Sequence, residues 1–127
     1  MSTLLAVPNV SEGRDRAVLD AIGAAFESAG GVRVLDVHAD PDHHRAVFTL
    51  AGAPGTLAPA LQNGAREAIA RIDLRTHEGA HPRVGALDVA PIVHRDAATR
   101  GHACAEALVA ADLLGQLGLP VYLYGEL

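Results

Sequence analysis

The sequence contains no tryptophan and no lysine, and it has only one cysteine and one methionine in 127 residues. Two tyrosines and two phenylalanines are its only aromatic residues, whereas half of all residues are hydrophobic. We therefore expect a core of small aliphatic side chains. A single cysteine cannot form an intrachain disulfide, and the apolar neighbours of Cys104 predict a buried, unreactive thiol in a reducing compartment.

Charge and hydropathy exclude several classes of protein. All ten basic residues are arginine and the formal net charge is −5, which argues against non-specific binding to nucleic acid, since that needs clustered cations. The hydrophobic content excludes intrinsic disorder. The chain has neither a cationic start followed by a long apolar run nor about 18 consecutive apolar residues. The sequence therefore predicts one soluble, cytoplasmic domain without membrane or nucleic-acid partners.

Hydrophobic periodicity predicts an alternation of strands and helices. Strands are expected at 4–7, 32–37, 45–50, 84–93 and 121–124, and helices at 18–29, 57–72 and 104–118. Gly30 and Gly31 should end the first helix, and Pro59 is tolerable in the first turn of the second. Gly85 and Pro91 predict a bulge or an edge in the fourth strand. The segment 76–83 has no apolar period and is expected to be a loop.

The first six elements follow the order β-α-β-β-α-β, and a further α-β unit follows them. This order predicts an α+β fold, a two-layer sandwich in which a mixed sheet carries helices on one face, with a split βαβ (ferredoxin-like) core. The chain stops directly after its last predicted strand, at Tyr124-Gly125-Glu126-Leu127, which suggests an interrupted protein.

Histidines are numerous, and five of the seven lie in predicted loops or at strand ends: His38, His43, His44, His77 and His81. The i, i+4 spacing of His77 and His81 would suit zinc on a helix, but Gly79 and Pro82 disfavour a helix there. We expect no zinc site formed by His43, His44, His77 and His81. An imidazole acting as a general base, oriented by Arg83, Glu78 or Asp88, is the favoured interpretation of this segment.

Two further polar segments each allow more than one role. The loop 9–14 precedes the first helix, and its backbone amides would suit a carboxylate or a phosphate. Helix capping by Asn9 or Ser11 is the commoner role, and Glu12 would oppose an anion. The alternating aspartates and histidines of 36–45 fit a metal site, a base with its carboxylate partner, or a polar turn.

Four segments together resemble a known family. They read VPNVSEGR at 7–14, LDV at 35–37, HPRVGALDV at 81–89 and PVYLYGE at 120–126. In order and spacing they resemble the N-terminal subdomain of glutamate formimidoyltransferase, and the resemblance covers essentially the whole chain. Two positions depart from the family pattern, because His38 stands where the family has a carboxylate and His44 where it has an asparagine.

The resemblance implies transfer of a formimidoyl group from N-formimidoyl-L-glutamate to the co-substrate tetrahydrofolate in histidine degradation. It implies that His81 is the catalytic base, and that a second subdomain, absent from residues 1–127, completes the folate site in trans or in a homo-oligomer. The residues expected to bind substrate are Asn9, Ser11, Glu12, Gly13, Arg14, His38, His44, Arg45 and Arg83. The arginines suit this role because a guanidinium grips a carboxylate through two hydrogen bonds.

Two alternatives of another class accompany this hypothesis. The chain could be a non-catalytic ligand-binding or partner subunit on the same scaffold, or a metal-dependent hydrolase that uses the loop histidines. A shared cleft would require the strand end at His38 and the loop at His81 to lie side by side at one end of the sheet.

Overall fold

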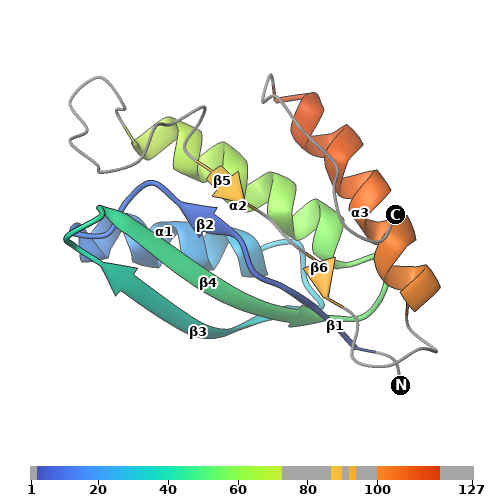
Figure 1. Cartoon of the computed structure of the whole chain (residues 1–127). Coiled ribbons are helices and arrows are strands. Elements are labelled where there is room, and N and C mark those ends of the chain that lie inside the picture. The colour runs from blue at the N-terminus through green and yellow to red at the C-terminus, as the bar shows by residue number, and fades with distance from the viewer. Residues whose placement is uncertain (1–2, 73–86, 90–91, 94–99, 118–127) are drawn as a thin grey trace.

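The structure is a computed structural model that describes residues 3–72, 87–89, 92–93 and 100–117 (Figure 1). Its strands are β1 (Leu4–Ala6), β2 (Asn9–Val10), β3 (Val32–Asp40), β4 (Arg45–Gly52), β5 (Leu87–Val89) and β6 (Ile92–Val93), and its helices are α1 (Arg16–Glu27), α2 (Leu57–Arg71) and α3 (Arg100–Gly115). The expected loop at 76–83 and the expected strand at 121–124 lie outside the described residues. None of the helices in the described part is long and apolar enough to cross a membrane.

The strands form one sheet with the connectivity that the element order predicts. β3 pairs with β4, β4 pairs with both β1 and β2, and β1 and β2 pair with β6 and β5, respectively. The fold is therefore α+β with a split βαβ core. The described pairings are all antiparallel, so the mixed sheet was wrong for this part of the chain. The reason is that an intervening strand separates the strands joined by each helix, as β4 separates β1 and β2 from β3.

Pro8 lies between the two short strands β1 and β2. Pro8 has no N–H to donate, and between β1 and β2 its carbonyl accepts a hydrogen bond from Phe48 N at 2.9 Å. The Asn9 side chain closes this break by donating from Nδ2 to Val7 O at 3.2 Å. Pairing with β4 then resumes, whereas the sequence predicted a loop from Pro8 onward. β5 and β6 lie on either side of residues 90–91, but Gly85 and Pro91 are outside the described residues, so the bulge or edge expected there stays a prediction.

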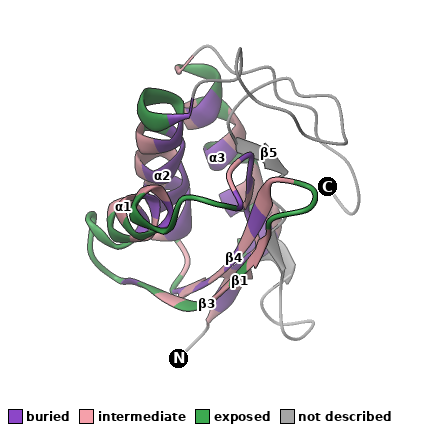
Figure 2. Ribbon diagram, turned by 90° about the vertical axis from the view of Figure 1, so that its left-hand side faces the viewer, coloured by how far each residue is buried: buried purple, intermediate pink, exposed green. Residues whose placement is uncertain are grey.

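The helices cover one face of the sheet (Figure 2). Alternate β4 residues Ala46, Phe48 and Leu50 are fully buried on that face, as period-2 patterning requires. Phe26 of α1 meets Phe48 edge to face, with ring centroids 5.1 Å apart and planes at 63°. The other buried apolar residues are mainly Ala, Leu, Val and Ile, which confirms the expected core of small aliphatic side chains.

Helix ends follow the expected signals with small shifts. α1 begins at Arg16 and ends at Glu27, and Gly30 and Gly31 then adopt φ values of 84° and 79°. α3 begins at Arg100, four residues earlier than predicted. Cys104 lies within it with a partly exposed side chain, so the prediction of a buried thiol was wrong. A helix exposes one side of its surface even when most of its residues are apolar, as the exposed Leu108 and Val109 of α3 illustrate.

Candidate functional site

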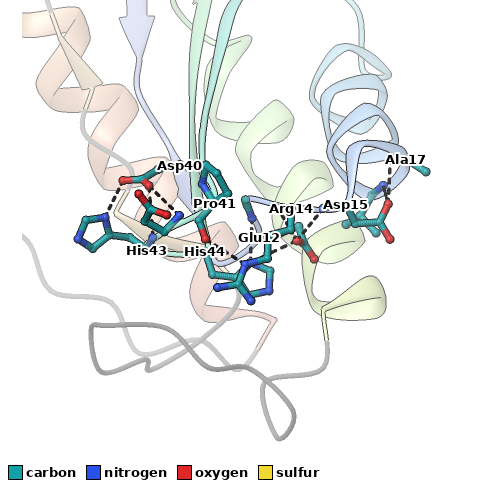
Figure 3. Close-up of polar contacts among 11 residues, drawn as sticks. Glu12, Arg14, Asp15, Ala17, Asp40, Pro41, His43 and His44 are labelled. Atoms are coloured by element: carbon teal, nitrogen blue, oxygen red, sulfur yellow. Dashed lines mark hydrogen bonds and ion pairs between the residues drawn. The ribbon is translucent and has the colours of Figure 1, made fainter.

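The loop 11–14 packs directly on the turn between β3 and β4 (Figure 3). A Cβ atom added at Gly13 would collide with Asp40 O and would lie 2.5 Å from Arg45 N and 2.7 Å from Arg45 O. The Arg14 side chain donates from Nε to Pro41 O at 2.9 Å. Only glycine can approach backbone this closely, so Gly13 fixes the loop against the turn.

His44 joins the loop to the turn through its ring. The backbone N–H of Gly13 donates to His44 Nδ1 at 3.0 Å, and Glu12 Oε2 lies 3.3 Å from the same nitrogen. Both side chains are largely buried, with exposed fractions of 13% for His44 and 12% for Glu12. His44 has a φ of 52°, in the left-handed region where Asn, Asp and His are enriched among non-glycine residues.

Glu12 has a structural role that the sequence did not reveal. Its Oε2 accepts hydrogen bonds from the backbone N–H groups of Arg14 and Asp15, both at 3.0 Å. The carboxylate is therefore turned toward the loop's own amides and toward His44. An anion near the loop would meet a carboxylate already engaged in hydrogen bonds.

The N-terminus of α1 is capped by a residue that the sequence analysis did not single out. Asp15 Oδ1 accepts from Ala17 N at 3.0 Å and from Val18 N at 3.3 Å. The capping role expected for Asn9 or Ser11 of the loop 9–14 was therefore wrong, because the N-cap is Asp15. Ser11 is fully buried. The signal available in the sequence was an aspartate immediately before the first helical residue.

The turn itself is organised by Asp40 and His43. Asp40 Oδ1 accepts from Asp42 N at 3.1 Å and from His43 N at 3.2 Å, and Oδ2 lies 2.7 Å from His43 Nδ1. The hydrogen bond with the His43 side chain, followed by that from the His43 backbone, lowers the pKa of Asp40 below its ordinary value. Of the three roles open for 36–45, the structure supports a polar turn for this pair.

Three other predicted site residues share the face of the sheet opposite the helices. Val47 pairs with His38 on one side and with Asn9 on the other, so these residues form one row. Strand spacing places the Cα atoms of His38 and Asn9 about 10 Å apart. Arg45 follows two residues before Val47 on β4 and so points to the same face. We call His38, Val47, Asn9 and Arg45 the open-face row.

The open-face row and the loop 11–14 meet at one end of the sheet, because β2 leads into the loop and β4 starts at the turn. Residues far apart in sequence are thus brought together at this end of the sheet. His81, Arg83 and His77 lie outside the described residues, so the expected proximity of His38 and His81 stays a prediction. Within the described residues, no group of three or more His, Cys, Asp or Glu side chains could hold a metal ion.

Comparison with known proteins bears on what this end of the sheet does. Residues 3–127 match the family described as formiminotransferase domain, N-terminal subdomain. The chain belongs to this family. Among formiminotransferase relatives, formimidoyltransferase-cyclodeaminase from Rattus norvegicus is 42% identical over 125 residues, which cover 94% of this chain and 22% of the relative.

Two shorter relatives carry the name glutamate formimidoyltransferase. The one from Streptococcus pyogenes is 39% identical over 121 residues, which cover 94% of this chain and 40% of the relative. The one from Thermoplasma acidophilum is 42% identical over 130 residues, which cover 99% of this chain and 42% of the relative. The chain therefore spans less than half the length of the relatives it matches, and the family resemblance is confirmed.

Proposed function

We propose that this chain is the base-carrying half of a glutamate formimidoyltransferase, which moves a formimidoyl group from N-formimidoyl-L-glutamate to tetrahydrofolate. The observation that carries the proposal is the family match over residues 3–127, together with relatives named for this transfer. The proposal includes a place in histidine degradation and a cytoplasmic location.

The reaction requires one group that takes up a proton and then returns it. A nitrogen of tetrahydrofolate attacks the formimidoyl carbon, a new C–N bond forms, and that nitrogen loses a proton. The C–N bond to glutamate then breaks, and the glutamate nitrogen gains a proton as it leaves as an amine. An imidazole near neutrality performs both transfers, and His81 is the residue proposed for this role.

Substrate recognition is assigned to the end of the sheet where the open-face row meets the loop. N-formimidoyl-L-glutamate carries carboxylates, and Arg45 and Arg83 are proposed to bind carboxylate groups of the substrates. Asn9 and His38 flank Val47 within this row, and they are proposed to offer polar side chains to the substrate. The remaining expected binding residues lie in the loop and the turn, and in this proposal they act by holding the loop on the turn. They are Ser11, Glu12, Gly13, Arg14 and His44.

A second subdomain, in trans, in a continuation of the chain or in a homo-oligomer, is proposed to cover the open face and complete the folate site. Holding two reactants in attack geometry contributes roughly 7–11 kcal/mol to lowering the barrier, and one half-site lacks that advantage. This chain by itself is therefore expected to turn over poorly.

The test mixes the purified 127-residue chain with the remaining portion of the Thermoplasma acidophilum relative, supplied as a separate polypeptide. Turnover of N-formimidoyl-L-glutamate and tetrahydrofolate should appear only in the mixture, and His81→Ala should lower it by roughly a hundred-fold or more. His102→Ala is the matched control, because His102 is exposed on α3. Turnover that survives His81→Ala would refute the assigned base. If the mixtures bind the substrates but show no turnover, the result would favour a non-catalytic binding subunit.

A further inference from the structure

The contact between Gly13 and His44 determines where the neutral ring carries its hydrogen. A backbone N–H is always a donor, so the nitrogen that receives it must present a lone pair. Gly13 N donates to His44 Nδ1 at 3.0 Å. The neutral His44 ring in this arrangement is therefore the tautomer with its hydrogen on Nε2.

Protonation of His44 would break this contact. The added proton goes to Nδ1, which then faces the Gly13 N–H as a second donor at 3.0 Å. The acceptor beside Nδ1 is Glu12 Oε2 at 3.3 Å, and it already accepts from Arg14 N and Asp15 N. An ion pair with Glu12 would thus replace the hydrogen bond from Gly13, and the Gly13 amide would lose its partner.

Other charged groups of the loop and the turn have partners of their own. Arg14 donates from Nε to Pro41 O, and the Asp15 carboxylate caps α1. Asp40 is engaged by Asp42 N and by both the backbone and the ring of His43. Arg45 pairs with Asp40 in the strand register at the start of β4. Among these described groups, Glu12 is the carboxylate beside His44 Nδ1, and it would accept a hydrogen bond from the protonated ring.

We propose that His44 is a proton-sensitive positioning residue, which holds the loop 11–14 on the β3–β4 turn when its ring is neutral and releases Gly13 when the ring is protonated. Imidazole is the side chain that changes charge between about pH 5 and 8, so the loop would be held at the alkaline end of this range. The proton dependence stands without the proposed function. Its consequence, weaker substrate binding at the acidic end, rests on the proposed function.

An asparagine at position 44 separates the hydrogen bond from the titration. Asn Oδ1 and His Nδ1 are both bonded to Cγ, so the amide oxygen can accept the same N–H from Gly13. Asparagine also tolerates the left-handed backbone of this position, where φ is 52°. His44→Asn should therefore keep the loop on the turn and remove its dependence on pH.

The test uses the ¹⁵N-labelled 127-residue chain between pH 5 and 8. Long-range ¹H–¹⁵N spectra should show His44 as the Nε2–H tautomer at pH 8, and the Gly13 amide shift should follow the same midpoint as the His44 ring. Protection of the Gly13 amide from exchange, corrected for intrinsic rates, should fall by about tenfold toward pH 5, the factor for one hydrogen bond. In His44→Asn the Gly13 amide should stay protected and should not titrate.

His43→Asn is the matched control, because His43 lies in the same turn and its ring contacts Asp40. It should leave the titration of Gly13 unchanged. An Nδ1–H tautomer at pH 8, or a Gly13 amide that does not follow the His44 ring, would overturn the proposal, and both are read from the unmutated chain even where a variant fails to fold. Absence of formimidoyl transfer would refute the proposed function and leave these spectra unaffected.

Discussion

Glu106 of α3 accepts hydrogen bonds from the backbone amides of Gly55 and Ala58 at the N-terminus of α2, at 2.5 Å and 2.7 Å. The N-cap residue of α2, Thr56, makes no side-chain capping bond of its own. Glu106 is 5% exposed, so these bonds form away from water. A carboxylate also suits the positive end of the helix dipole. α3 thus supplies the cap that α2 lacks, and it ties the two helices together.

Removing this carboxylate should destabilise the domain. We expect Glu106→Ala to lower the free energy of unfolding by about 3 kcal/mol, because hydrogen bonds to a charged group contribute about 1.5–3 kcal/mol each and two backbone amides, of which that of Ala58 is buried, would lose their acceptor. Glu106→Gln keeps one acceptor oxygen and should cost about half as much. Urea unfolding measures both. The control is Glu67→Ala, which removes a partly exposed pair with Arg71 and should cost under about 1 kcal/mol. Equal costs for Glu106→Ala and Glu67→Ala would contradict the capping role.

Sequence patterns predicted the local features of this fold, but they did not predict the long-range contacts. Period-2 and period-3.6 patterns locate β4 and α2, and Gly30-Gly31 locates the end of α1, because each depends on residues close in sequence. Glu106 is 48 residues from Ala58, so no local pattern links the two. The prediction that the loop 9–14 belongs to a site rests on its polar sequence and on the family resemblance, whereas its contact with the turn became evident only in the structure.

Two helix glycines should respond oppositely to alanine. A Cβ at Gly23 of α1 would lie 3.5 Å from Phe48 Cε2, an ordinary contact, whereas a Cβ at Gly64 of α2 would collide with the ring of Phe26. Gly23→Ala should raise the free energy of unfolding by about 0.5–1 kcal/mol through helix propensity. Gly64→Ala should lower it by about 1–3 kcal/mol, because Phe26 is fully buried and has little room to move. Chemical unfolding compares the two, and a stabilised Gly64→Ala would show that the α1–α2 interface can relax.

The loop 11–14 should not tolerate a side chain at Gly13. Gly13→Ala would force Cβ against backbone atoms of Asp40 and Arg45, which cannot rotate away. We expect the free energy of unfolding to fall by about 3 kcal/mol, at the upper end of overpacking costs. The backbone amides of the loop should also exchange their hydrogens with solvent faster. Gly115→Ala is the control, because a Cβ there, at the end of α3, meets no atom of the described residues within 4 Å. If Gly13→Ala were as stable as Gly115→Ala, the loop would not be packed on the turn as described.

The hydrogen bond between His43 and Asp40 should be visible as a pH effect confined to the acidic range. The pKa of Asp40 is lowered, first by the His43 side chain and then by the His43 backbone amide. A carboxyl group with a lowered pKa adds stability that is present above its unfolded pKa of about 3.9 and is lost as the pH falls through the folded pKa. His43→Ala should therefore raise the pKa of Asp40 toward its ordinary value, as followed by ¹³C NMR of the carboxyl carbon between pH 2 and 6. His102→Ala, which changes an exposed histidine on α3, should leave the Asp40 titration where it was. An Asp40 titration unchanged by His43→Ala would mean that the backbone amides alone organise this turn.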